Sequence, residues 1–243
     1  MKNTHPPHGT LRLLRGEPSP NGAGQAQLFL LAGDPTVAPV LEVIPAEGLA
    51  LPPARTDLAE QPFRLCLLHS NDLHGHISRV TSYGHRPIFS RMVWRLRQLR
   101  QRFRSDPDAA VLFLSAGDDL MGVILGELLG DDPDSYVVHA GYRLYSEAGL
   151  DAGVLGNHEL DLGPALLACA LRRDACFPML SANLASCRQL DGVIYPAAIL
   201  VVKGLRVGIA GLTTRGQVKK ASAAGLCMAD PLQTAHNLIP VSY

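Results

Sequence analysis

Apolar residues cluster in runs of strand length, and these runs alternate with segments of helical periodicity. In residues 87–103, apolar side chains recur at the spacing of one helix face. Helices are expected there and at 134–150 and 163–173, and strands at 63–70, 109–118, 151–159 and 177–184. This alternation predicts an α/β fold whose parallel strands are covered by helices.

The last part of the chain has a different pattern. Residues 197–214 predict two strands joined by a tight turn at Lys203-Gly204, and residues 230–238 predict a helix. The hairpin adds antiparallel pairing, so the fold class that we expect is α/β with mixed sheets flanked by helices.

The first 60 residues differ in composition from the rest. They contain nine of the 18 prolines, and the short apolar runs LRLLRGE, AQLFLLAG and VLEVIPA are separated by turn-forming pairs. We interpret residues 1–60 as a β-rich or partly disordered N-terminal extension, and residues 61–243 as the main domain.

Composition favours a globular protein and gives no sign of a polyanionic partner. The hydrophobic fraction is 47%, and the 22 basic and 22 acidic residues give a formal net charge of zero. Neither nucleic acid nor a membrane is therefore expected as a partner. The arginine-rich run RMVWRLRQLRQRFR is interpreted as a solvated helix face, and the five cysteines as reduced core thiols.

Three of the predicted strands are expected to be buried, and each of them ends in a polar cluster. Asp72 and His74 follow the first strand, Asp118 follows the second, and Asn157 and His158 follow the third. If the strands are parallel, these clusters lie at one rim of the sheet, where ligands of open α/β sheets bind. Gly117 and Gly156 are expected to allow sharp turns there.

Such a group of carboxylates and imidazoles is costly unless positive charge lies among them. A divalent cation is the simplest source of that charge. Carboxylate, imidazole and amide ligands suit Mn²⁺, Zn²⁺, Fe²⁺ or Mg²⁺, and the absence of a thiolate disfavours a structural zinc site. The sequence therefore predicts a metal site.

The blocks LHSNDLHGHI, SAGDDLMG and GNHELD, in this order, resemble the first signature blocks of the calcineurin-like metallophosphoesterases. More narrowly, they resemble the branch that contains the 5′-nucleotidases and the 2′,3′-cyclic-nucleotide phosphodiesterases. FPMLSANL and GLRVGIAGLTT are similar to the segments that follow in that branch. The resemblance covers about residues 62–235 and implies a metallophosphoesterase-type sandwich.

The resemblance also implies roles for individual residues. Asp72 and His74 would bind the first metal and Asp118 would bridge both metals. Asn157 would bind the second. His158 would face the phosphate, oriented by Asp161.

The implied cofactors are two divalent ions, with Mn, Zn, Fe, Co and Mg left open. A hydroxide between them would attack the phosphorus of a small phosphate ester, most simply a nucleotide.

The chain departs from the family pattern after His158. The family completes its metal site with later histidines, but this chain has only His236, interpreted as an ordinary residue of the helix predicted at 230–238. The family's nucleoside-binding domain is also missing. We therefore expect a phosphoesterase domain that is incomplete at its C-terminus and hydrolyses weakly or not at all.

Two alternatives stay open. The chain could be a non-catalytic remnant or a binding protein of the same fold, or its substrate could be another small phosphate ester. No apolar leader follows the start, which predicts a cytoplasmic location, whereas the resemblance implies the periplasm or the extracellular space.

Overall fold

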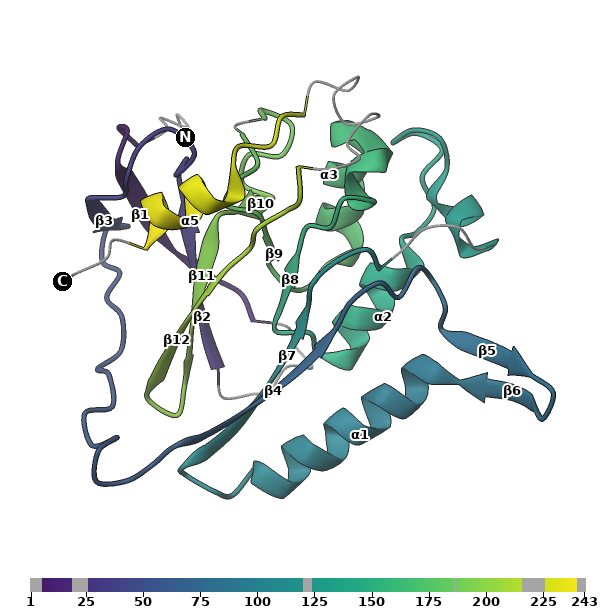
Figure 1. The fold of residues 1–243 in the computed structure, drawn as a ribbon, viewed down its shortest axis with the longest axis horizontal. Coiled ribbons are helices and arrows are strands. Elements are labelled where there is room, and N and C mark those ends of the chain that lie inside the picture. Colours follow the sequence, from purple (N-terminus) through teal and green to yellow (C-terminus); the bar gives the residue numbers. More distant parts are fainter. Residues whose placement is uncertain (1–5, 19–25, 120–123, 186, 216–225, 240–243) are drawn as a thin grey trace.

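A computed structural model describes residues 6–18, 26–119, 124–185, 187–215 and 226–239, which form two five-stranded sheets (Figure 1). The first sheet has the order β10-β9-β8-β7-β4, and all its neighbouring strands are parallel. Its strands are β4 (Arg64–Ser70), β7 (Ala109–Ser115), β8 (Ala152–Val154), β9 (Met179–Leu180) and β10 (Ile194–Tyr195). This parallel sheet carries the strand ends on which the metal prediction depends.

The second sheet has the order β12-β11-β2-β1-β3 and is antiparallel except between β1 and β3. Its strands are β1 (Thr10–Gly16), β2 (Ala26–Ala32), β3 (Glu42–Pro45), β11 (Ala197–Val202) and β12 (Leu205–Ala210). The predicted turn at Lys203-Gly204 is present. The hairpin that it closes does not extend the parallel sheet, however, because β11 pairs with β2.

Residues 1–60 contribute three strands, β1 to β3, to the second sheet, and the predicted short strands are therefore present. They are not an extension of the main domain, because β2 is hydrogen-bonded along its length to β11 and Phe29 is fully buried. The strand pairing does not follow the domain boundary expected at residue 60, because strands from both sides of that boundary share one sheet. Sequence alone did not reveal that β2 pairs with a strand almost 170 residues further along the chain.

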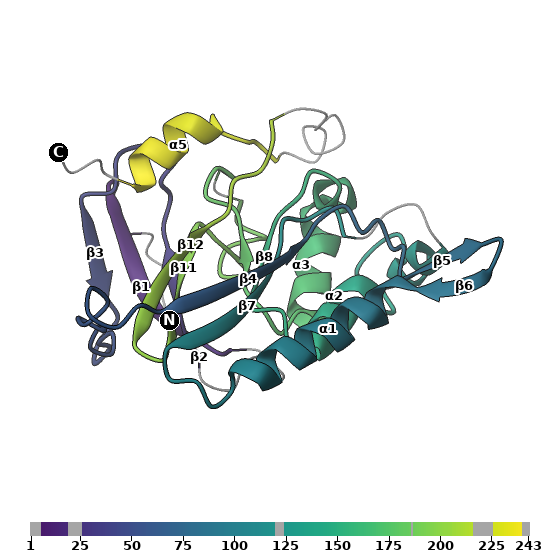
Figure 2. The ribbon, with the colours of Figure 1, turned by 60° about the horizontal axis from the view of Figure 1, so that its bottom comes forward.

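The two sheets pack face to face. Leu28 and Leu30 of β2 and Ala198 and Leu200 of β11 form one apolar cluster with residues of the parallel sheet. Those residues are Leu112, Ala152 and Leu180. Helices cover the other face of the parallel sheet (Figures 1 and 2), and the predicted α/β class with mixed sheets flanked by helices is confirmed.

The predicted helices are present, with one corrected start. Their bounds are α1 (Ile88–Phe103), α2 (Ala140–Ala148), α3 (Gly163–Asp174) and α5 (Pro231–Leu238), with 3₁₀ turns η1 (Ile124–Leu129) and η2 (Glu159–Leu162). Helix α2 begins at Ala140 instead of near residue 134, because the Ser135 N–H donates to Asp132 in a separate turn. None of the described helices is both long and apolar enough to span a bilayer.

Two further expectations about burial were wrong. Strand β4 is an edge strand, and Leu67 in its centre is 55% exposed, so it is not a buried strand. All five cysteines are free as expected, but Cys176 and Cys227 are exposed instead of lying in the core. Apolar composition identified a strand and small apolar residues, but it did not show which of them lie at the surface.

His139 begins α2 and is buried within the helical layer. Its Nδ1 accepts a hydrogen bond from the Tyr142 N–H at 3.0 Å, and its ring stacks on the Tyr142 ring with centroids 3.5 Å apart. Burial lowers the pKa of His139 to about 3, because water no longer stabilises the charged form. This imidazole therefore stays neutral in the folded protein at mildly acidic pH.

We expect His139 to make stability depend on pH. The unfolded chain takes up a proton at this histidine below about pH 6.5 and the folded chain does not, so the free energy of unfolding falls as pH decreases towards about 3. The slope from one such group approaches about 1.4 kcal/mol per pH unit. Urea unfolding of His139→Asn, which keeps a cap acceptor, should show a flatter dependence between pH 6.5 and 4. An unchanged slope contradicts this account.

Candidate functional site

The loops that follow β4 and β7 are joined by backbone hydrogen bonds at the carboxyl end of the parallel sheet. The Asp72 N–H donates to the Gly117 carbonyl, and the His74 N–H donates to the Asp118 carbonyl, each at 3.0 Å. The Gly75 N–H donates to the Asp119 carbonyl, also at 3.0 Å. Two segments that are more than 40 residues apart in sequence are thus held side by side.

The loop after β8 contacts the loop after β7 just as closely. The His158 N–H donates to Asp118 Oδ1 at 2.9 Å. A Cβ at Gly117 would lie 2.5 Å from the Gly156 nitrogen, and one at Gly156 would lie 2.3 Å from Asp118 Oδ1. Gly117 has φ of +90° and turns as predicted, whereas Gly156 has no positive φ and serves the close approach instead.

Three of the predicted ligands have left-handed backbones. The φ angles are 51° at Asp72, 45° at His74 and 56° at Asp118, and Lys203 is the only other non-glycine residue with positive φ in the part of the chain that the structure describes. Such conformations cost free energy for residues with a Cβ and concentrate at functional sites. Backbone strain therefore marks the residues that the sequence singled out.

Two imidazoles and their acidic partners lie at this rim. The His74 and His158 rings meet edge to face with centroids 5.1 Å apart, and His74 Nε2 is 3.5 Å from Asp72 Oδ1. His158 Nδ1 lies 3.2 Å from Asp161 Oδ2. An Nδ1–H that donates to Asp161 fixes the tautomer and leaves Nε2 of His158 for other chemistry.

Two buried acids support the loops. Glu159 Oε2 accepts the Asp118 N–H at 3.1 Å, and Glu159 Oε1 accepts the Asp119 N–H at 2.9 Å. Asp119 accepts hydrogen bonds from the Ser115 hydroxyl and, at 2.7 Å, from the Tyr145 hydroxyl. In the sequence, only the positions of these two acids beside Asp118 and His158 point to a role at the site.

The pKa values of these two acids are raised, chiefly by burial and in addition by neighbouring acids. Burial raises the pKa of Asp119 to about 6, and the charges of Asp118 and Asp72 add to the effect. Burial raises the pKa of Glu159 to about 7, with further contributions from Asp119 and Asp118. No described Lys or Arg forms an ion pair with any of these four acids. The acids of the rim therefore have histidines as neighbours but no described Lys or Arg to neutralise them.

The side chains do not form a closed cage. Within the described ranges, no three His, Cys, Asp or Glu side chains are grouped closely enough to hold one ion. Asn157, which follows Gly156 in the third loop, is half-buried. The ligand types suit a divalent cation in chemistry, and backbone hydrogen bonds bring their segments together, while the side chains themselves are not gathered around one point.

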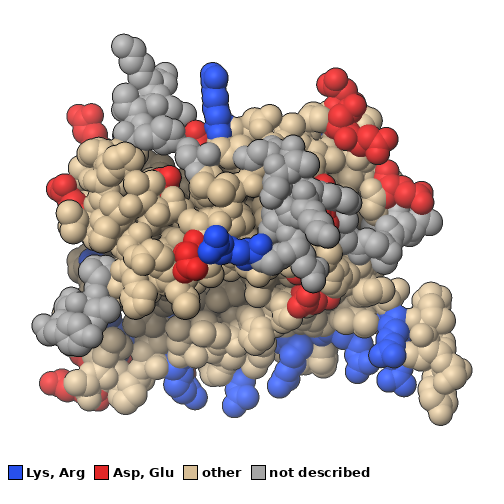
Figure 3. Space-filling model, turned by 45° about the horizontal axis from the view of Figure 1, so that its top comes forward, with Lys and Arg blue, Asp and Glu red and all other residues tan. Residues whose placement is uncertain are grey.

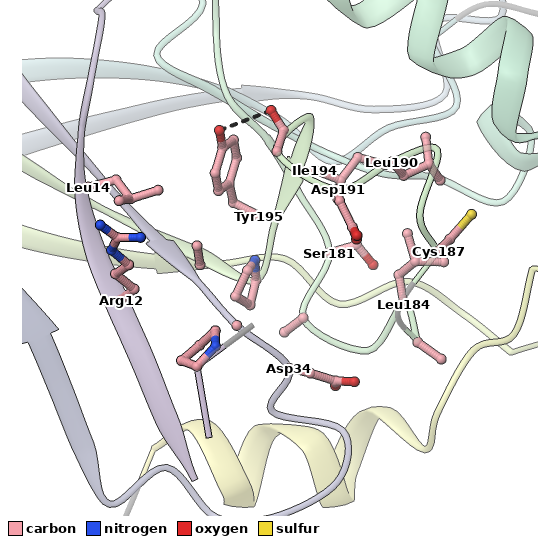
Figure 4. Close-up of a pocket in the computed structure, with 17 residues that line it drawn as sticks. Arg12, Leu14, Asp34, Ser181, Leu184, Cys187, Leu190, Asp191, Ile194 and Tyr195 are labelled. Atoms are coloured by element: carbon pink, nitrogen blue, oxygen red, sulfur yellow. Dashed lines mark hydrogen bonds between the residues drawn. The ribbon is translucent and has the colours of Figure 1, made fainter. Parts of the chain in front are cut away.

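The described residues also line cavities away from this rim. A cavity of about 200 Å³ lies between residues of β1 and β2 and the segment 181–196 (Figure 4). None of the predicted site residues lines it, and the carboxylate of Asp34 in its wall accepts the Thr36 N–H at 2.9 Å. The strand-end rim is therefore the better candidate site, because strain, charge and imidazoles coincide there.

Comparison with known proteins gives a consistent picture, although no protein-family model matches the chain. The chain is 31% identical over 198 residues to the 5′-nucleotidase of Vibrio cholerae serotype O1, covering 79% of this chain and 33% of that protein. The crystal structure of the 5′-nucleotidase precursor from Thermus thermophilus matches with a TM-score of 0.51 and 30% identity, covering 72% of this chain and 33% of the other.

The calcineurin-like phosphoesterase YfkN from Bacillus subtilis shares the fold alone, at 22% identity and a TM-score of 0.52 over 72% of this chain and 57% of the other. These likenesses place the fold among the calcineurin-like phosphoesterases. Within that class, the sequence is similar to the N-terminal portion of the 5′-nucleotidases, and the predicted resemblance is confirmed. The chain spans about a third of the length of the curated relatives that it matches.

We expect the strain at Asp72 to be measurable. Asp72→Gly should have a free energy of unfolding about 1 kcal/mol higher than Asp72→Ala, because glycine adopts the left-handed backbone without a Cβ penalty. Urea unfolding of both variants measures the difference. At the neighbouring Asn71, whose φ is not positive, alanine should be the more stable of the same two substitutions. The same order at both positions contradicts the strain argument.

Glu159 is expected to be a positioning residue for Asp118. In Glu159→Gln the side-chain amide would face one of the two N–H donors, so the Asp118 loop should loosen and Mn²⁺ affinity should fall by about 10- to 100-fold. Titration calorimetry with Mn²⁺ tests this, with Glu127→Gln, an exposed change of the same chemistry, as control. Wild-type affinity in Glu159→Gln contradicts the assignment.

Proposed function

We propose that this chain is the metal-binding part of a phosphoesterase that hydrolyses the phosphate esters of nucleotides. The observation that carries the proposal is the meeting of three strand-end loops, with left-handed backbones at Asp72, His74 and Asp118. The similarity to 5′-nucleotidases over most of this chain supports the same reaction class. Because the match covers only about a third of these relatives, the activity of the whole protein is part of the proposal.

Asp72, His74, Asp118 and Asn157 would hold two divalent cations, whose identity among Mn, Zn, Fe, Co and Mg stays open. When bound, such cations would offset the negative charge of the phosphate and lower the pKa of water, so that hydroxide is available to attack phosphorus. The chain's contribution is placement. The backbone N–H groups of Asp72, His74 and Asp118 donate hydrogen bonds that fix the Cα positions of these residues. Cation binding would therefore cost little conformational entropy of the backbone.

His158 would handle the proton of the leaving alcohol. Asp161 lies 3.2 Å from its Nδ1 and holds that nitrogen as the donor, so Nε2 can carry a proton to the leaving oxygen. The His158 N–H donates to Asp118, and this hydrogen bond fixes the backbone of the proposed proton donor relative to a predicted metal ligand. One side chain thus links the predicted metal site to the expected position of the substrate.

A nucleotide is the proposed substrate class because the relatives are named as 5′-nucleotidases. A non-catalytic remnant of the same fold is the second candidate. It is favoured by a specific observation, because in the described residues no three side chains form a closed metal group. The two functions differ in the number of metal ions that the chain binds.

The test combines metal binding with hydrolysis. Calorimetry with Mn²⁺ should find about two ions per chain, and p-nitrophenyl phosphate and AMP should be hydrolysed slowly and only with Mn²⁺. His158→Asn should lower the rate by about 10²- to 10⁴-fold without changing Mn²⁺ affinity, because it removes the proton donor but no ligand.

Asp118→Asn should lose both Mn²⁺ binding and turnover, and the exposed Asp131→Asn should lose neither. Binding of no ion or one ion, together with no turnover, would favour the non-catalytic remnant over the enzyme. Metal-independent hydrolysis would contradict the proposed site.

A further inference from the structure

One surface of the molecule carries positive charge without negative charge. Between Leu73 and Ser105 the sequence has eight arginines and no Asp or Glu. These residues form the hairpin of β5 (Ser78–Thr81) and β6 (Gly84–Pro87) and then α1. The hairpin projects beyond the end of α1 (Figure 2), and Figure 3 shows a row of Lys and Arg along the lower edge, the side on which α1 lies in Figure 1. We call the outer surface of β5, β6 and α1 the basic face.

The arginines on the outer side of α1 have no acidic partner in the described part of the chain. Arg91, Arg95 and Arg102 are exposed, and none of them forms an ion pair with a described residue. Arg100, on the inner side, differs because it donates to the Gly149 carbonyl and to Asp151. Arg100 therefore has a structural role in the packing of α1. The outer arginines have no ion-pair partner among the described residues.

The hairpin holds two arginines in an unfavourable pair. Arg79 and Arg86 are directly opposite each other in the antiparallel register of β5 and β6, and both are exposed. Like charges at such a pair repel each other and weaken the hairpin. No described acidic residue forms an ion pair with either one. An anion bound to both side chains would turn this repulsion into attraction.

Large apolar side chains are exposed within the basic face. Tyr83 is 88% exposed in the turn of the hairpin, and Trp94 is 62% exposed on α1. Trp94 is one helical turn from Arg91 and from Arg97. Aromatic side chains flanked by arginine are typical of groups that enter the headgroup region of a bilayer.

We propose that the basic face binds the surface of an anionic lipid bilayer. The face extends along the 16 residues of α1, about 24 Å, and a small anion could not neutralise it. Single-stranded nucleic acid could stack on Trp94 and Tyr83, but the exposed aliphatic Ile88 would gain nothing from it, whereas acyl chains near the interface would cover it. The zero net charge of the chain conceals this face, because acidic residues elsewhere balance it.

The chain supplies its own reporter, because Trp94 is its one tryptophan. Phosphatidylserine-rich vesicles should shift Trp94 emission to shorter wavelength and expose it to quenching by brominated lipid. Pure phosphatidylcholine vesicles should do neither, and added salt should reverse the shift. An emission spectrum that phosphatidylserine leaves unchanged would overturn the proposal.

Matched charge reversals locate the contact. Arg91→Glu with Arg95→Glu, and separately Arg79→Glu with Arg86→Glu, should each lower vesicle cosedimentation by about tenfold or more. Arg12→Glu with Arg15→Glu, exposed on β1 in the other sheet, should not. Circular dichroism and thermal unfolding confirm that each variant is folded. Equal losses in all three pairs, or tighter binding to single-stranded DNA than to vesicles at the same salt, would overturn the proposal.

Discussion

The structure depends on the close approach of the loops that follow β4, β7 and β8. Gly117 and Gly156 leave no room for a Cβ between two of these loops, and backbone hydrogen bonds join the third to them. That approach brings Asp72, His74, Asp118 and His158 to one rim. It also brings acids together with no Lys or Arg paired to them among the described residues. The proposed cation would relieve the same repulsion that the packing creates.

The helical layer holds this rim in place together with the loops themselves. Tyr145 on α2 links the Ser70 hydroxyl, 2.9 Å away at the end of β4, to Asp119 after β7. Glu159 holds the two backbone N–H groups that begin the second loop. The helical layer and the parallel sheet thus share one polar network. Its members are largely buried, and so the position of Asp118 is insensitive to motions of solvent-exposed side chains.

The basic face and the rim show how average composition can mislead. Balanced charge excluded a polyanionic partner only on the assumption that acids and bases are mixed over the surface. In this chain the arginines of the hairpin and α1 are gathered on one side, and the carboxylates of the rim lie at the strand ends. Local charge density, which the fold sets, decides what a surface attracts.

The sequence by itself determined the elements and the candidate residues. The periodicity of α1, the hairpin at Lys203-Gly204 and the polar ends of β4, β7 and β8 follow from local patterns that neighbouring residues enforce. Only the tertiary structure decided that β1 to β3 complete the second sheet, that β4 is an edge strand and that Asp119 and Glu159 support the site. Strand partners and burial depend on contacts between distant segments, and periodicity within one segment carries no information about them.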